Sequence, residues 1–402
     1  MFTSITPLWS RPLALLALAA ATACAAAPAL AADSPQVVTE TLHAFGADEG
    51  QQGRTPLLQA SDGKLYGVTL GGGGTALRGT LFRMNPGGLY ETVYEFSGSD
   101  TVGGQPGSGP VQGSDGALYG TTQLGGASNY GTVYRIDLNG VHTTLHSFVP
   151  TNPSAIVSDT WLAQGPDGYL YGTSRVDGEF DAGSVFRLKT DGSDYRVLHS
   201  FTTGEGGREP WGAPLVGKDG LLYGSTRFGG NNDCGTIFRV QRNGAFEVLN
   251  SMCNGGETDP AYPAADLIQD ASGALYGTTE FGGAYGSGTV FRRNVDGTID
   301  TLRSFNKRDG IGYGLTARLV RDKRGVLYGV TRFGGENKQG TAFAVKPSGR
   351  TTLLHTFAAN RTDGRYPWGP LMQADDGKLY GMTSGGGQYT FYGTVYRIAP
   401  SN

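Results

Sequence analysis

Leu65-Tyr66-Gly67-Val68-Thr69 is the first copy of the segment that decides the fold of this chain. The Leu-Tyr-Gly triplet recurs seven times, at steps of 53, 52, 52, 53, 52 and 52 residues. Its tyrosines are Tyr66, Tyr119, Tyr171, Tyr223, Tyr276, Tyr328 and Tyr380. A repeat of this length is typical of solenoids and propellers. The chain is therefore built from seven copies of one supersecondary unit.

Turn residues divide each unit into four short strands, A to D. Pairs such as Asp115-Gly116 and Asn139-Gly140 accept the positive φ that tight hairpin turns need. A longer glycine-rich loop separates strand B from strand C. In the first unit the strands are Pro56–Gln59, Leu65–Thr69, Gly79–Arg83 and Thr92–Phe96. Four antiparallel strands repeated seven times predict an all-β, seven-bladed β-propeller.

The two ends of the repeat array complement each other. The last unit stops after strand C, Gly393–Ile398, and lacks a strand D. The missing strand is found near the amino terminus, where Glu40–Phe45 matches Thr144–Phe148. We therefore expect the N-terminal strand to complete the last blade and close the ring. An open solenoid, the alternative, would not need this strand.

The first 31 residues differ from the rest and are predicted to be a secretory signal peptide. Arg11 provides a positive start, Leu13–Ala23 is apolar, and Ala29-Leu30-Ala31 fits a cleavage site. Ala21–Cys24 is a weaker match to a lipoprotein acylation site. Residues 32–402 are then one propeller domain, secreted or periplasmic, with no membrane span and expected to be a monomer.

Composition supports a packed β fold and argues against two classes of partner. Of 402 residues 67 are Gly, 38% are hydrophobic and only 17% are charged, which suits many tight turns around a core. Removing the leader leaves 31 basic and 35 acidic residues, with no basic stretch. Nothing in this pattern indicates nucleic acid or an anionic membrane as a partner.

Two cysteines remain after the leader, Cys234 and Cys253, and a pair is expected to bond in an oxidising compartment. If Asn243-Gly244 is a two-residue turn, Arg242 faces Ala245 and the numbers of paired residues sum to 487. Cys234 and Cys253 have the same sum, so we predict a disulfide across two strands. Two unrelated thiols are the alternative.

The motifs resemble those of the GloVer tandem-repeat family of bacterial proteins, also called choice-of-anchor tandem repeat proteins. The residues that carry the resemblance are Leu118–Thr122, Gly125-Gly126 and Gly131–Arg135. The resemblance implies an extracytoplasmic location and a propeller-like fold, but no activity. Many relatives carry a C-terminal sorting anchor; the ending Ala399–Asn402 shows no such pattern.

Most conspicuous side chains are interpreted as framework. The repeated tyrosines and the strand C aromatics occur in every blade, which favours packing between blades. His43, His146, His199 and His355 share one slot on the outermost strand, and no histidine is left for a catalytic triad or a zinc site. The glycine runs lack the Lys-Ser/Thr and the helix of a phosphate loop.

The residue that follows strand B changes from blade to blade, as framework positions do not. In chain order it is Leu70, Gln123, Arg175, Arg227, Glu280, Arg332 and Ser384. The B–C loops and D–A connections are the longer ones and share one face, which is the default binding face. The three arginines can hold carboxylates or sulfates by bidentate hydrogen bonds, or each can pair with a nearby acid.

Two further features lie on this face. In blade three Asp177, Glu179 and Asp181 replace the usual Gly-Gly loop; they can bind Ca²⁺, supply an acid/base pair, or simply be solvated. No other cofactor is predicted. The D–A connections carry aromatic residues that either stack on sugars or wedge between blades. These are Trp161, Trp211, Tyr262, Tyr313, Tyr366 and Trp368.

Three functions remain open from the sequence. The leading hypothesis is a binding module that recognises a glycan or a protein through the long-loop face. The second is a polysaccharide-active enzyme, either a uronate lyase with an Arg and a Tyr, or a hydrolase with two carboxylates. The third is an assembly scaffold, whose function should not change when Arg175, Arg227 and Arg332 are mutated.

Overall fold

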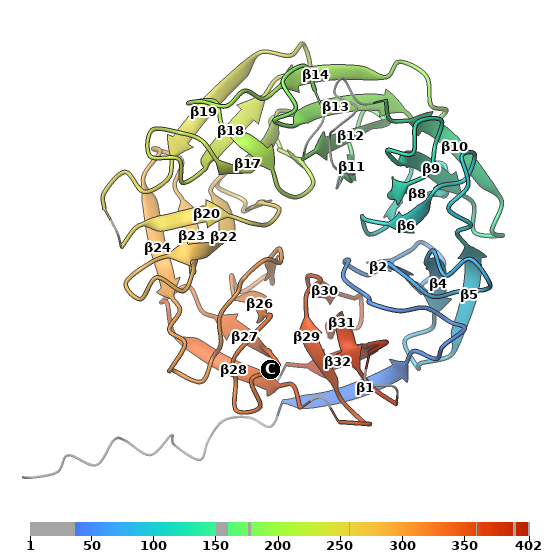
Figure 1. Cartoon of the computed structure of the whole chain (residues 1–402). Coiled ribbons are helices and arrows are strands. Elements are labelled where there is room, and N and C mark those ends of the chain that lie inside the picture. The colour runs from blue at the N-terminus through green and yellow to red at the C-terminus, as the bar shows by residue number, and fades with distance from the viewer. Residues whose placement is uncertain are drawn as a thin grey trace, which may run out of the picture. The chain divides into compact units, whose positions relative to one another are not determined.

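The computed structural model describes residues 37–149, 160–175, 178–256, 258–358, 360–388 and 391–400. In these ranges the chain is all β, and seven four-stranded antiparallel blades stand in a ring, as predicted (Figure 1). No helix in the same ranges is long and apolar enough to cross a membrane. The predicted leader, residues 1–31, and Asp177 lie outside the described residues.

The strands run from the centre of the ring outward as A, B, C and D. Blade one contains β2 (Leu58–Gln59), β3 (Leu65–Thr69), β4 (Thr80–Met84) and β5 (Tyr90–Glu95). Blade two contains β6 (Gly104–Pro106), β7 (Val111–Gln112), β8 (Leu118–Leu124), β9 (Thr132–Ile136) and β10 (His142–Ser147). Blade three contains β11 (Thr160–Gln164), β12 (Tyr169–Ser174), β13 (Ser184–Lys189) and β14 (Arg196–Ser200). Blade four contains β15 (Arg208–Pro210), β16 (Leu215–Val216), β17 (Leu222–Phe228), β18 (Thr236–Val240) and β19 (Phe246–Ser251). Blade five contains β20 (Pro260–Pro263), β21 (Ile268–Gln269), β22 (Leu275–Gly282), β23 (Thr289–Arg293) and β24 (Ile299–Ser304). Blade six contains β25 (Val320–Arg321), β26 (Leu327–Thr331), β27 (Thr341–Val345) and β28 (Thr351–Thr356). Blade seven contains β29 (Gly364–Pro367), β30 (Met372–Gln373), β31 (Leu379–Gly386), β32 (Thr394–Ala399) and, as its outer strand, β1 (Val38–Ala44).

In four blades the inner strand is split into two pieces, which the sequence did not predict. β6 and β7, for example, both pair with β8. The piece that comes first in the chain contains a residue in the left-handed region, with φ between 52° and 58°. Its backbone N–H donates to a carbonyl in the B–C loop of the preceding blade, at 2.6–2.8 Å. These residues are Gln105, Glu209, Tyr262 and Tyr366.

Each boundary between blades is filled by its own core. The described residues form seven hydrophobic clusters, and each cluster takes its members from two neighbouring blades. The repeated tyrosines are part of this framework, because each hydroxyl donates to an Asp of the A–B turn at 2.7–3.1 Å, as Tyr66 does to Asp62. Burial raises the pKa of Tyr66 to about 12. The tyrosines therefore remain neutral hydrogen-bond donors.

Closure of the ring occurs as predicted. β1 pairs antiparallel with β32, with Glu40 opposite Arg397 and Ala44 opposite Thr394. Phe45, which follows β1, is fully buried in the cluster that joins blade seven to blade one. The first and last parts of the array are thus held by the same packing as any other pair of blades, and the ring leaves no blade without its outer strand (Figure 1).

The disulfide Cys234–Cys253 is present, so the predicted pairing is confirmed. The predicted turn, however, is wrong. Gln241, not Arg242, lies opposite Ala245, because the turn has three residues and ends with Gly244 in the left-handed region. A bulge between β18 and β19 then shifts the register by one residue and restores the sum of 487.

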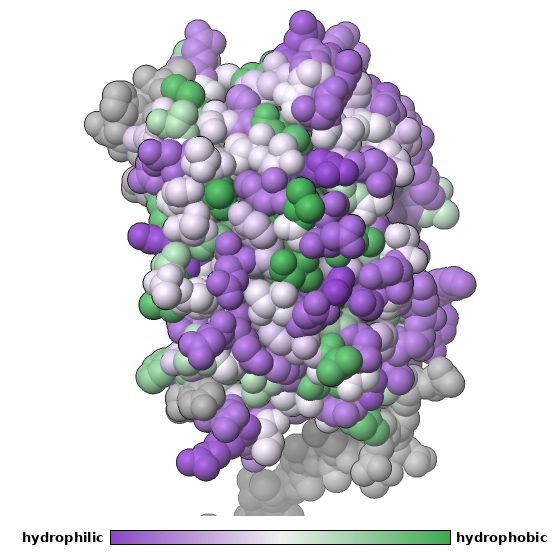
Figure 2. Space-filling model, turned by 90° about the vertical axis from the view of Figure 1, so that its right-hand side faces the viewer, coloured by the Kyte–Doolittle hydropathy of each residue, from purple (hydrophilic) through white to green (hydrophobic). Residues whose placement is uncertain are grey.

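The outer wall is polar, with single apolar side chains scattered over it (Figure 2). Three histidines of the shared strand D slot, His43, His146 and His199, stack here on an aromatic ring of the next blade. The His199 ring stacks on Phe246 with centroids 3.8 Å apart, and the His146 ring stacks on Tyr195 at 3.8 Å. Burial lowers the pKa of His199 to about 4. These contacts give the slot a packing role between blades.

Candidate functional site

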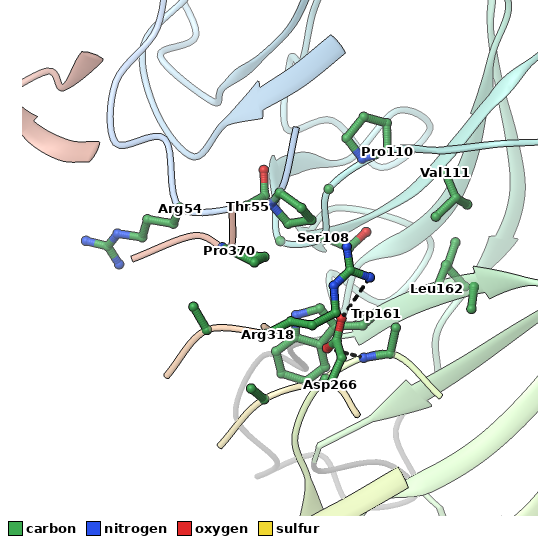
Figure 3. Close-up of a pocket in the computed structure, with 18 of the residues that line it drawn as sticks. Arg54, Thr55, Ser108, Pro110, Val111, Trp161, Leu162, Asp266, Arg318 and Pro370 are labelled. Carbon is green, nitrogen blue, oxygen red and sulfur yellow. Dashed lines mark hydrogen bonds and ion pairs between the residues drawn. The ribbon is translucent and has the colours of Figure 1, made fainter. Parts of the chain in front are cut away.

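A cavity of about 620 Å³ opens at the centre of the ring and is lined by residues from all seven blades. About half of its lining residues are Leu, Val, Ala or Pro, and polar and aromatic side chains make up most of the rest (Figure 3). A cavity of this size, lined by apolar side chains together with polar ones such as Gln52, Gln123 and Arg318, is large enough for a small ligand. The cavity is formed where the D–A connections enter the inner strands, on the long-loop face.

One tier of this wall has a different residue in nearly every blade. In each blade, one residue of strand A pairs with the repeated tyrosine. The tier consists of the residue two positions before that partner in each blade. Its members all line the cavity: Pro56, Gly109, Trp161, Ala213, Asp266, Arg318 and Pro370. A packing position would carry similar residues in each repeat, so this tier has the variability expected of a recognition surface.

Asp266 and Arg318 form the polar part of the tier. Arg318 Nη1 lies 3.7 Å from Asp266 Oδ2, and the Ala213 N–H donates to Asp266 Oδ1 at 2.8 Å (Figure 3). Only 19% of the Asp266 side chain is exposed. Burial raises the pKa of this carboxyl, and the nearby Arg318 charge only partly opposes the rise. Sequence reasoning missed both residues; counting back from each strand A partner would have aligned them.

The structure brings two of the three predicted arginines together, over Trp211. The Arg175 and Arg227 guanidinium carbons lie 4.9 and 5.4 Å from the Trp211 ring. Each arginine also has an acid: Glu209 lies 3.5 Å from Arg175, and Glu280 lies 2.6 Å from Arg227. The Trp211 cluster, defined by these five residues, is therefore balanced in charge.

The third predicted arginine lies elsewhere, against Trp368. The Arg332 guanidinium carbon is 3.6 Å from the ring centroid, and that of Arg54 is 5.0 Å from it. We call Arg332, Arg54, Trp368 and Tyr366 the Trp368 cluster. Among the residues that the structure describes, Arg332 forms no ion pair, and its buried Nε has no hydrogen-bond partner. Burial, and next the charge of Arg54, lower the pKa of Arg332.

The other predicted site residues are placed as follows. Gln123 lines the cavity, and the Tyr366 carbonyl accepts a hydrogen bond from Ser384. The blade-three loop follows the same turn as its neighbours: Asp181 has positive φ like Asp233, and the Glu179 N–H donates to Ser200 Oγ. In the described part of this loop the acids thus occupy ordinary repeat positions.

No group of three or more His, Cys, Asp or Glu side chains within the described ranges is arranged to hold a metal ion. Asp177, one of the three acids proposed for Ca²⁺, is not among the described residues. The Trp211 and Trp368 rings, for which the sequence left both sugar stacking and wedging between blades open, contact guanidinium groups. The Trp161 ring centroid lies 5.7 Å from that of Trp211, and all three tryptophans line the cavity.

Comparison with known proteins identifies the repeat and the fold. The family model described as the Gloeobacter/Verrucomicrobia repeat matches residues 30–164, 152–318 and 313–402. No curated protein matches the sequence.

Solved structures similar to the chain include two kinds of propeller protein. The extracellular domain of a B. thetaiotaomicron protein described as a hybrid two-component system has a TM-score of 0.57 at 12% identity, over 91% of this chain and 41% of that one. An oligogalacturonate lyase in complex with manganese has a TM-score of 0.56 at 12% identity, over 91% of both chains. The lyase from Vibrio parahaemolyticus has a TM-score of 0.53 at 10% identity, over 90% of this chain and 97% of that one.

At these identities the likeness shows a shared fold alone. The chain spans about two fifths of the length of the B. thetaiotaomicron domains that it matches.

Proposed function

The chain belongs to the Gloeobacter/Verrucomicrobia repeat family, and we propose that it is an extracytoplasmic module that binds a glycan in the mouth of its propeller. Similar folds occur in extracellular domains of B. thetaiotaomicron proteins, and the chain contains a disulfide, which suits an oxidising compartment.

The observation that carries this proposal is the variable tier inside the 620 Å³ cavity. Seven equivalent positions carry residues as different as Trp161, Asp266 and Arg318, although the strand A residue two positions further on pairs with the repeated tyrosine in every blade. A rigid ring whose inner residues differ is well suited to recognise one asymmetric small molecule. The rigidity lowers the entropy that ordering a binding site would cost.

Sugar chemistry fits the side chains of this tier. The Trp161 ring offers an apolar face to the C–H side of a pyranose ring. The Arg318 guanidinium donates hydrogen bonds and the Asp266 carboxyl accepts them, so together they can bind adjacent hydroxyl groups. Because the Asp266–Arg318 pair is already oriented by the Ala213 N–H, little reorganisation is needed on binding.

The test is binding of the mature protein to a broad glycan array, followed by titration calorimetry with the best oligosaccharide. We expect Trp161→Ala to lower the affinity about tenfold, equivalent to about 1.4 kcal/mol. Tyr285→Ala is the matched control, since Tyr285 is an exposed aromatic (60%) in a B–C loop that does not line the cavity. If no glycan binds, or if both variants behave alike, the proposal fails and a protein ligand or a scaffold role gains weight.

A second function, cleavage of a polysaccharide, is favoured by one observation. Burial raises the pKa of Asp266, which is the direction required of a general acid, and this carboxyl lies in the cavity wall. The test is product formation from acidic and neutral polysaccharides, with Asp266→Asn as the inactive variant. If the wild type forms no product from the panel, the enzyme hypothesis fails and the binding hypothesis remains.

A further inference from the structure

The Trp211 and Trp368 clusters occupy equivalent places in blades four and seven. Trp211 and Trp368 each follow a proline in a Pro-Trp-Gly segment, and each ring is contacted by the arginine that follows strand B of the preceding blade. In the Trp211 cluster that arginine is Arg175, and in the Trp368 cluster it is Arg332. The two clusters therefore share one design and can be compared position by position.

The clusters differ in charge at several equivalent positions. Ser384 and Leu70 stand where the Trp211 cluster has Arg227 and Glu280, and the acid beside the shared arginine is also lost. Glu209, directly before the proline of blade four, pairs with Arg175 at 3.5 Å. The equivalent residue in blade seven is Tyr366, which has the same left-handed backbone, with φ of 52° against 53°. The acid is thus replaced by a neutral side chain. Glu280, which also influences Arg332, is already bonded to Arg227 at 2.6 Å.

Two guanidinium groups at one ring raise the electrostatic energy of the Trp368 cluster. Arg54 and Arg332 both contact Trp368, and the charge of Arg54 contributes to lowering the pKa of Arg332. Like charges held close together in a partly buried place destabilise each other, and a bound anion relieves that repulsion. A guanidinium stacked flat on an indole keeps its N–H edge directed away from the ring, where it can grip an oxyanion in bidentate fashion.

The Trp368 cluster also adjoins the cavity. Trp368 and Arg54 both line it, together with Trp161, Asp266 and Arg318 of the variable tier. Arg54 donates a hydrogen bond to Gln52, another lining residue, at 2.7 Å, which fixes its direction. A saccharide held at the tier therefore has an adjoining basic site at the same mouth.

We propose that Arg332 and Arg54, both held against Trp368, bind an anionic group carried by a sugar, so that the ligand of the mouth is an acidic glycan. This inference rests on the proposed glycan-binding function and adds the chemical class of the ligand. Trp368 acts as a platform that holds the arginines rather than as a stacking surface for the sugar. The anionic group is a carboxylate or a sulfate, which the guanidinium fork recognises in the same way.

The experiment compares three probes by calorimetry with the mature protein: oligogalacturonate, its methyl ester, and a chondroitin sulfate oligosaccharide. The methyl ester has the same backbone but no charge. We expect at least one anionic probe to bind about tenfold more tightly than the methyl ester. The tighter of the two anionic probes identifies carboxylate or sulfate as the group recognised.

Two variants test the assignment to the Trp368 cluster. Arg332→Gln should remove most of the preference for the anionic probe, about tenfold, and leave binding of the methyl ester within about twofold. Tyr366→Glu should do the same, because it places the acid of blade four beside Arg332. Arg239→Gln, which removes an equal charge from an exposed pair with Glu247, is the matched control and should bind as the wild type does.

The outcomes separate the two proposals. If the ester and the acids bind equally, or if Arg332→Gln keeps the preference for the acids, the present inference fails while glycan binding stands. If none of the probes and no glycan on the array binds, the proposed function itself fails. Loss of binding in Arg239→Gln would show that net charge, and not the Trp368 cluster, attracts the anion.

Discussion

Blades four and seven contain the same Pro-Trp-Gly segment, yet the two blades treat charge in opposite ways. In blade four, Glu209 and Glu280 neutralise the arginines at Trp211. In blade seven, two arginines share Trp368, and Arg332 has no ion pair among the described residues. Tyr366 in place of Glu209, Ser384 and Leu70 in place of Arg227 and Glu280, and the added Arg54 together separate a charge-balanced cluster from one that favours an anion.

The same two blades also differ in how their outer strand is fastened. β19 of blade four is tied through Cys253 to Cys234, just before β18. The outer strand of blade seven is β1, from the other end of the chain, and it is held by its hydrogen bonds to β32, by the Glu40–Arg397 ion pair and by packing of Phe45. A covalent link therefore supports the blade with the balanced cluster, while noncovalent packing closes the blade with the basic one.

The largest expected effect comes from breaking that covalent link. Cys234→Ser with Cys253→Ser opens a loop with a sequence separation of 19 residues, for which chain entropy predicts a loss of about 3 kcal/mol in the free energy of unfolding. Urea unfolding of the double variant and of the wild type, without reductant, measures the loss. With reductant present the two proteins should have the same midpoint; a wild type that gains nothing from the disulfide would contradict the prediction.

The next effect compares the arginines directly. Arg227→Gln leaves Glu280, only 26% exposed, without its partner and should lower the free energy of unfolding by about 1–2 kcal/mol. The loss stays below that of a fully buried pair because Glu280 lies near enough to Arg332 to influence it. Arg332→Gln should change stability by less than about 0.5 kcal/mol, since it removes a repulsion from Arg54.

Thermal unfolding of both variants tests this comparison. The double variant Arg227→Gln with Glu280→Gln should recover part of the loss, since no unpaired carboxylate remains. If Arg332→Gln proves the more destabilising of the two single changes, then Arg332 holds the fold together and the contrast between the clusters is lost.

The smallest expected effect concerns the outer wall of the same regions. His199 packs on Phe246 of blade four, whereas His43 of blade seven packs on Tyr90 and bonds to Glu49 at 2.8 Å. Burial lowers the pKa of His199 to about 4 from an ordinary 6.5. As the pH falls, His199 therefore binds a proton in the unfolded chain before it does so in the folded chain. Its contribution to the free energy of unfolding is complete above pH 6.5 and is lost between about pH 6.5 and 4.

Between pH 7 and pH 5 we expect His199→Tyr to reduce the acid-induced loss of unfolding free energy by about 1 kcal/mol, allowing for the partial exposure of the ring. Tyrosine is a fair replacement because Tyr94 occupies the same slot in blade one. His142 and His146, whose pKa values burial also lowers, would keep a residual slope. An unchanged pH dependence in the variant would show that His199 is not responsible.

Much of the fold could be predicted because it depends on contacts that repeat. The period of the Leu-Tyr-Gly triplet gave seven blades, and the strand at Glu40–Phe45 gave the closure. The pairing of Cys234 with Cys253 was right for a partly wrong reason, since a three-residue turn and a bulge cancel each other. Two local irregularities of opposite effect cannot be seen in a count of residues.

The candidate site was harder to predict, because its members come from different blades. Sequence reasoning singled out Arg175, Arg227 and Arg332 as one set, but the structure divides them between two tryptophans. It also overlooked three residues of the cavity wall: Arg54, Asp266 and Arg318. The tier residues occupy one aligned position of the repeat, but only the closed ring shows that this position faces the cavity.

The number of blades, their order and the strand that closes the ring follow from the sequence alone, because they depend on a pattern of turns and buried side chains that recurs in every repeat. Only the tertiary structure decided which charges meet. Ion pairs and cation–π contacts act over a few ångströms, and such distances between residues of neighbouring blades are set by how the blades pack around the axis. The balance at Trp211, and the position of Arg332 at Trp368 without an ion pair among the described residues, are therefore properties of the closed ring.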